Sequence, residues 1–179
     1  MPVRGDALTL FQPVSLGRGI VEVFSGVSPA AGANFTRTTA QGYAERLVGL
    51  TWQVVTDATA ANRNLSVVYQ DADTNPFALQ TAPNVQTATT TVVYGATIGG
   101  SAAGVLVGGR MSLALPPLIL FPGHRFVIQV SNIQVTDAIT AIRGLVERFS
   151  LGADGYPVGE TELPYTERGR GYVRGLESE

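Results

Sequence analysis

Apolar and polar positions alternate in short runs through residues 19–151, and turn residues separate the runs. Successive side chains of a β-strand point to opposite faces, so alternation with a period of two indicates a strand with one buried face. The first run, residues 19–26, places Ile20, Glu22 and Phe24 on one face. A turn rich in proline and glycine follows it, as expected at the end of a strand.

Residues 43–57 predict a longer strand, in which Leu50, Trp52 and Val54 share one face and belong to the core. The run at 138–152 alternates less cleanly, and a helix is the alternative there. We interpret it as a strand because it is rich in β-branched and aromatic residues, which favour a pleated surface.

About eight strands follow from this pattern, which is typical of an all-β, antiparallel β-sandwich. The predicted strands are at 19–26, 43–57, 65–70, 77–82, 87–95, 105–115, 121–135 and 138–152. We expect residues 19–151 to form one sandwich, with an extended N-terminal arm at 1–18 and a C-terminal tail at 152–179.

The composition narrows the class of protein. With 179 residues, 45% of them hydrophobic and 15% charged, the chain is long enough to bury one core. It has no cysteine, which excludes disulfides, zinc–thiolate sites and thiol nucleophiles. A net charge of -2 gives no general attraction to nucleic acid, and no segment predicts a membrane helix or a secretory signal.

The only histidine, His124, lies between a Pro-Gly pair and an arginine in FPGHRF. A general base or a metal ligand needs partners, and the chain has no GxSxG serine to supply one. We therefore interpret His124 as the corner where a strand begins. Asp71, Asp73 and Asn75 have the first ligand spacings of an EF-hand loop, but Pro76 stands where that loop needs glycine. We expect no catalytic residues, no bound metal and no cofactor.

A hydrolase with paired carboxylates is one alternative. Glycosidases use two carboxyl groups that meet across a cleft. The sequence leaves two such pairs open, Glu45 with Glu147 and Asp57 with Asp137.

Two features predict contacts with other chains. No charged residue occurs from Thr74 to Gly109, and an uncharged surface of that length predicts cover by another chain, although the loop GGSAAG also explains part of it. The tail at 152–179 combines glycine, proline and charge with three tyrosines, which predicts ordering on a partner; an unattached terminus is the alternative. The candidate interface residues are Arg4, Phe11, His124, Arg125, Tyr156, Tyr165, Arg168, Arg170 and Tyr172.

The chain resembles the jelly-roll accessory proteins of tailed-bacteriophage particles between Tyr43 and Phe149. The similar segments are GYAERLVGLTWQVVTDATAANRNLSVVYQDAD, a threonine-rich strand, LPPLILFPGHRFVIQVSN and DAITAIRGLVERF. The resemblance implies a jelly roll and a non-enzymatic structural role in the virion, as a capsid decoration or cement protein or as a collar, connector or tail component. It implies a homo-oligomer, with a trimer favoured, and the major capsid protein or neck and tail proteins as partners.

A carbohydrate-binding, adhesive jelly roll is the second alternative. Exposed aromatic side chains would then line a groove, and Tyr43, Tyr69 and Tyr94 are the candidates.

Overall fold

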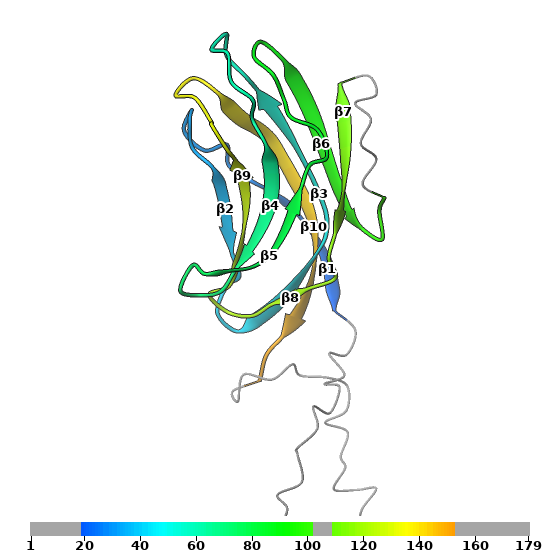
Figure 1. Cartoon of the computed structure of the whole chain (residues 1–179). Coiled ribbons are helices and arrows are strands. Elements are labelled where there is room, and N and C mark those ends of the chain that lie inside the picture. The colour runs from blue at the N-terminus through cyan, green and yellow to red at the C-terminus, as the bar shows by residue number, and fades with distance from the viewer. Residues whose placement is uncertain (1–18, 102–108, 153–179) are drawn as a thin grey trace, which may run out of the picture.

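The computed structural model describes residues 19–101 and 109–152, which form ten β-strands and no helix (Figure 1). The strands are β1 (Ile20–Ser25), β2 (Phe35–Thr38), β3 (Tyr43–Val55), β4 (Leu65–Gln70), β5 (Pro76–Thr81), β6 (Thr91–Ile98), β7 (Arg110–Leu115), β8 (Ile119–Leu120), β9 (Arg125–Val130) and β10 (Ala138–Ser150). The all-β prediction is confirmed for this part of the chain.

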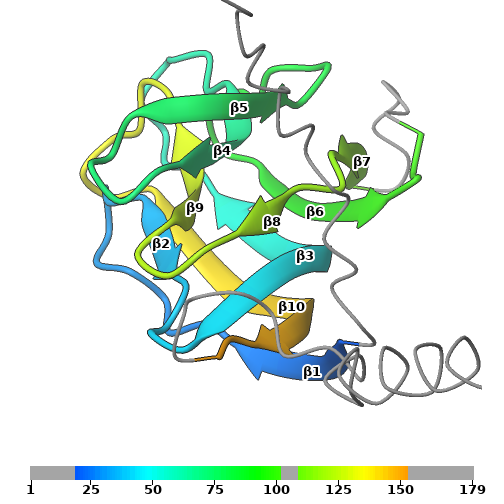
Figure 2. The same cartoon turned by 90° about the horizontal axis from the view of Figure 1, so that it is seen from below.

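The strands form two sheets that pack face to face (Figure 2). Sheet A has the order β1-β10-β3-β6-β7, with β8 also paired to β3, and sheet B has the order β2-β9-β4-β5. Neighbouring strands are antiparallel except for β6 and β7, which run parallel. In Figure 1 the loops at 57–64 and 131–137 lie at the upper end, whereas β1 begins and β10 ends at the lower end.

The core between the sheets follows the predicted faces. Leu50, Trp52 and Val54 of β3 are all buried, as the alternation predicts. The Trp52 ring stacks on Tyr94 of β6, with 5.3 Å between ring centroids and 13° between the planes. Aromatic pairs of this kind add to the free energy gained by burial alone.

The segment around His124 is a turn that leads into a buried strand. The His124 amide donates to the Phe121 carbonyl at 2.9 Å, and Gly123 has φ 84°, so Pro122 and Gly123 occupy the central positions of a type II turn. Beyond the turn, β9 buries alternate side chains in the core, namely Phe126, Ile128 and Val130. The interpretation of this stretch as a strand corner is confirmed.

A bulge in β10 explains why apolar and polar residues alternate imperfectly along this strand. Ala141 has φ 51°, and the register with β3 shifts between Thr140 and Arg143. This bulge lets Ile139 and Ile142, three positions apart, both face the core. A three-residue spacing is also a helical signal, which is why the sequence favoured a strand less clearly here.

The prediction missed two short strands. In β2 only Phe35 is buried, so the alternating signal is too short to detect, and β8 has two residues. Residues 87–90, predicted as strand, form a turn in which the Thr56 hydroxyl bonds to the Thr87 carbonyl and the Thr90 amide. The first part of the predicted strand at 105–115 lies outside the described residues. Its second part is observed as β7.

Candidate interaction surface

A buried arginine holds together the loops at the upper end. The Arg63 side chain has no exposed surface, and all five of its N–H groups donate hydrogen bonds. Two go to Asp137, at 2.9 and 3.0 Å, and one to Asp57, at 2.7 Å. The other two go to the carbonyls of Thr59 and Ala61. The cluster therefore fixes the loop after β3 to the loop before β10.

The two aspartates of this cluster are held in the ionised form. Burial acts to raise the pKa of Asp137, but hydrogen bonds from Arg63 and from the amides of Gln134 and Asp57 outweigh it and leave the pKa below its ordinary value. A hydrogen bond from the Thr136 hydroxyl lowers the pKa of Asp57. A general acid needs a raised pKa, so this pair has the opposite of the property that the hydrolase alternative requires.

A second charged cluster lies between the sheets at the lower end. Glu45 of β3, with 3% of its side chain exposed, accepts hydrogen bonds from Arg37 of sheet B and Arg148 of sheet A, each at 2.9 Å. Arg148 also pairs with Glu22 at 2.7 Å. Glu147 instead bonds to Arg46. The predicted pair of Glu45 and Glu147 thus divides between two ion-pair groups, and the buried group joins the two sheets.

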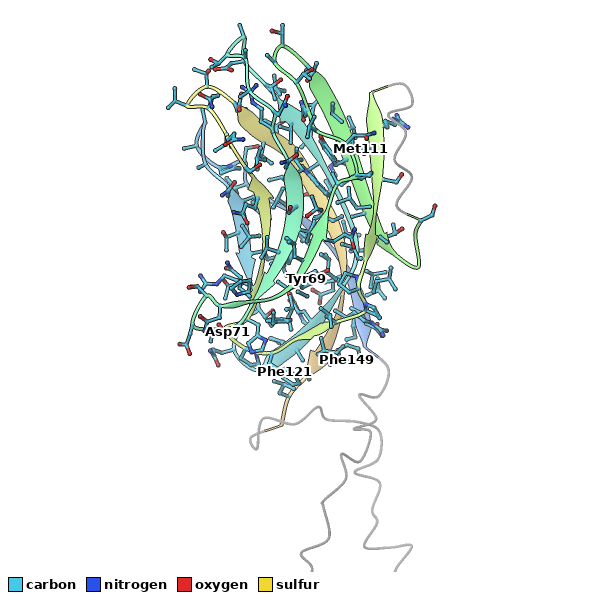
Figure 3. All side chains as sticks on the ribbon, viewed as in Figure 1. Tyr69, Asp71, Met111, Phe121 and Phe149 are labelled. Carbon is cyan, nitrogen blue, oxygen red and sulfur yellow. The ribbon has the colours of Figure 1, made fainter. Side chains whose placement is uncertain are left out.

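His124 lies between two exposed phenylalanines. Its ring is 5.8 Å from the Phe77 ring and 6.0 Å from the Phe121 ring, measured between centroids. Phe77 is 47% exposed and Phe121 is 42% exposed. We call Phe77, His124 and Phe121 the aromatic patch. Figure 3 shows Phe121 at the lower end of the body. Exposed aromatic side chains of this kind are enriched in protein interfaces.

Of the predicted interface residues, His124 and Arg125 lie within the described part of the chain. Arg125 donates to the carbonyl of Ala72 at 3.3 Å, which fixes the neighbouring turn beside the patch. The sequence named His124 but missed Phe77 and Phe121, because an apolar residue in a strand pattern is assigned to the core by default. The remaining candidates lie outside the described residues: Arg4, Phe11, Tyr156, Tyr165, Arg168, Arg170 and Tyr172.

The turn at 71–75 is stabilised by its own side chains. The Asp71 carboxylate accepts hydrogen bonds from the amide and the side chain of Asn75, at 2.8 and 3.0 Å. These bonds occupy the oxygens that an EF-hand loop would direct at calcium. Nowhere in the ranges 19–101 and 109–152 do three acidic, histidine or cysteine side chains gather in a metal-binding arrangement. The same ranges contain no helix long and apolar enough to cross a membrane.

The three tyrosines proposed to line a glycan groove do not share an exposed surface. Tyr69 and Tyr94 have no exposed surface, and only Tyr43 is partly exposed, with Arg148 packed over its ring. Two of the three rings are therefore core residues and cannot stack on a sugar. This corrects the aromatic set of the adhesive alternative.

One row of mostly small or apolar residues crosses the outer face of sheet A. The strand registers place one residue from each of five neighbouring strands in a single row, in the order Val23, Leu145, Gly49, Thr97 and Ala114. Because glycine leaves the floor open, the row contributes to a shallow groove of about 350 Å³. Thr51 and Arg143 also line the groove, so its walls are partly polar.

No protein-family model matches the chain, and no curated protein is significantly similar to it in sequence.

Proposed function

We propose that this protein is a non-enzymatic structural component of a tailed-bacteriophage particle, with capsid decoration as its role. In this proposal it binds the major capsid protein and acts as a homo-oligomer, for which the sequence resemblance favours a trimer. Collar, connector and tail positions are the alternatives within the same class.

The strand orders support a jelly roll as the finer description of the fold. A jelly roll winds eight strands into two four-stranded antiparallel sheets through Greek-key connections. Here β1-β10-β3-β6 and β2-β9-β4-β5 form two such sets, in which β10 returns to pair with β1 and β9 returns to pair with β2. In this description β7 and β8 are additions between the sixth and the ninth strand.

The observation that carries the proposed function is the aromatic patch. Two phenylalanine rings remain nearly half exposed on either side of a histidine. Burying such rings in a partner releases free energy in proportion to the apolar area, at roughly 25 cal/mol per Å². In each charged cluster the buried side chains, Arg63 with Asp137 in one and Glu45 in the other, are already paired within the fold.

Binding to purified particles tests the proposal. The wild-type protein should co-sediment with capsids, and the double variant Phe77→Ser with Phe121→Ser should bind at least about tenfold more weakly, as expected when central aromatic contacts are lost. Val135→Ser is the matched control, because Val135 is 83% exposed in the upper loop, away from the patch. Wild-type protein that binds neither capsids nor tails would contradict the proposal.

The copy number per particle separates the positions. Quantitative mass spectrometry should find hundreds of copies for capsid decoration, and about a dozen or fewer for a neck or tail component.

A further inference from the structure

Strand β1 is an edge strand with one open side. In the described part of the chain it pairs with β10 alone, and no strand lies on its other side. Figure 2 shows β1 at the margin of sheet A. Natural edge strands are protected from pairing by proline, charge or short length. The other edges follow this rule: β5 begins with Pro76, β2 has four residues and includes Arg37, and β7 begins with Arg110.

No such protection is found on β1. It contains neither proline nor a basic residue, and its single charge, Glu22, pairs with Arg148 of the neighbouring strand. Its apolar residues are among the most exposed of the described chain: Ile20 is 67% exposed, Val21 60% and Val23 75%.

The hydrogen-bonding pattern shows which residues face the open side. The Gly26 amide donates to the Ile142 carbonyl at 2.9 Å, and the register with β10 continues without a shift to Ile20. In an antiparallel pair the bonded residues alternate. Even-numbered residues of β1 therefore direct their backbone groups at β10, and Val21, Val23 and Ser25 direct theirs at the open side.

We propose that β1 pairs antiparallel with β1 of a second copy about a two-fold axis at Val23. Val23 then bonds to Val23 of the second copy, and Val21 bonds to Ser25 of the second copy in both directions. All three outward-facing residues find backbone partners. The inference rests on the proposed function, because it specifies one of the contacts between copies that an assembly protein needs.

Charge and side-chain packing favour this register. An axis at Glu22 would set the two glutamates directly opposite each other, whereas the axis at Val23 sets each one opposite Phe24 and brings two exposed valines together. On the outer face, Arg143 of β10 lies beside Ser25 of β1, and Glu147 of β10 lies beside Val21 of β1. The two-fold aligns Arg143 of one copy with Glu147 of the other across about three strand spacings, roughly 14 Å, where salt screens most of the attraction, so this pair adds little to the choice of register.

The pairing also extends the groove on sheet A. Val23 lines that groove together with Leu145 and Gly49. Joining two sheets at β1 places two grooves side by side across the axis. The resulting unit is a dimer, which differs from the trimer that the resemblance favours.

Single cysteines test the register directly, because the natural chain contains no cysteine. Bonded antiparallel neighbours have Cα atoms about 5.5 Å apart, within the range of a disulfide. Val23→Cys should form a covalent dimer under mild oxidation, both in solution and on particles. The control Val135→Cys, at 83% exposure in the upper loop against 75% for Val23, should not form one although it is at least as accessible.

Proline provides the complementary test. The Val23 amide faces away from β10, so Val23→Pro removes a bond between copies without removing one within the sheet. It should weaken dimerisation at least about tenfold in analytical ultracentrifugation, as for loss of a central contact. The fluorescence of the buried Trp52 should stay native. Val23→Arg should weaken dimerisation similarly, and it keeps the inference testable if the proline variant fails to fold.

The outcomes separate the inference from the proposed function. Cross-linking through Val23→Cys together with a monomeric Val23→Pro supports the pairing. Absence of the cross-link, or a Val23→Pro protein that remains dimeric, overturns it, even where the wild-type protein binds particles. Failure of the wild-type protein to bind any particle contradicts the proposed function and leaves the cross-linking result to decide the pairing.

Discussion

Replacing Asp137 by asparagine removes one charge from the Arg63 cluster while keeping the size of the side chain. Asp137 has no exposed surface, and its carboxylate makes two of the five hydrogen bonds of Arg63. It also accepts the amides of Asp57 and Gln134, at 2.9 and 2.8 Å. Asparagine offers one oxygen for these four bonds and turns an N–H group toward the guanidinium.

The cost follows from the burial of Arg63. Removing one partner of a buried ion pair typically costs about 3–5 kcal/mol, because the remaining charge stays buried. Asp57 still contacts the guanidinium at 2.7 Å, so we expect a value near the lower limit, about 3 kcal/mol. The whole domain is stable by about 5–15 kcal/mol, so the variant loses a large part of its stability.

Urea unfolding, followed through the fluorescence of the only tryptophan, measures this loss. Trp52 is buried in the core and reports on the whole body. With a slope of about 1–3 kcal/mol per molar urea, the midpoint should fall by about 1–3 M. Arg46→Ala is the control: it removes a partly exposed ion pair with Glu147 and should cost no more than about 1 kcal/mol.

The reasoning would be refuted if Asp137→Asn lost less than about 1 kcal/mol, the size expected for a surface pair. That result would mean that the upper loops rearrange and hydrate the guanidinium at little cost. An equal loss in Asp137→Asn and Arg46→Ala would refute it as well, since burial is the only reason to expect a difference.

Three further predictions concern pH and packing. Because the pKa of Asp137 is lowered in the folded state, its contribution is present above about pH 4 and is lost as the pH falls; the difference in unfolding free energy between wild type and Asp137→Asn should shrink in acid, and a constant difference would contradict this. Burial raises the pKa of Tyr69 and of Tyr94, so both should resist ionisation above about pH 10, and phenolate absorbance should develop fully only on alkaline unfolding; full titration in the native state would contradict their burial. Gly144→Ala should cost about 1–3 kcal/mol in urea unfolding, because its Cβ would lie 2.3 Å from the Phe24 ring, whereas Gly95→Ala meets nothing within 4 Å and should be neutral; equal effects would show that the ring moves freely.

The predicted strands and the observed ones agree where alternation extends over several residues. Leu50, Trp52 and Val54 were predicted on one buried face, and they lie there. Alternation does not predict a strand in which a single residue is buried, as Phe35 is in β2. Nor does it reveal that Arg63, in a polar turn sequence, is wholly buried, because its partner Asp137 is distant in the chain and close only in the fold.

The interaction surface was predictable only in part. His124 stood out as the single histidine between turn residues, and it lies in the aromatic patch. Phe77 and Phe121 could not be distinguished from core phenylalanines, since local patterns do not show which strand lies at an edge. The open side of β1 depends on strand order, which is set by pairing between the two ends of the described chain.

The position of β10 has a consequence for how the protein is made. β1 pairs only with β10 and β2 only with β9 in the described structure, so the earliest strands find their partners among the last. While the nascent chain emerges from the ribosome, β1 remains without its partner until more than a hundred later residues have been synthesised, because Ile20 pairs with Arg148. Strand β2 waits for about ninety, because Thr38 pairs with Arg125 and Phe35 with Ile128. Such long-range pairing slows folding. Completion of sheet A therefore waits for β10, and a chain released before β10 is made leaves both sides of β1 without a strand partner in that sheet.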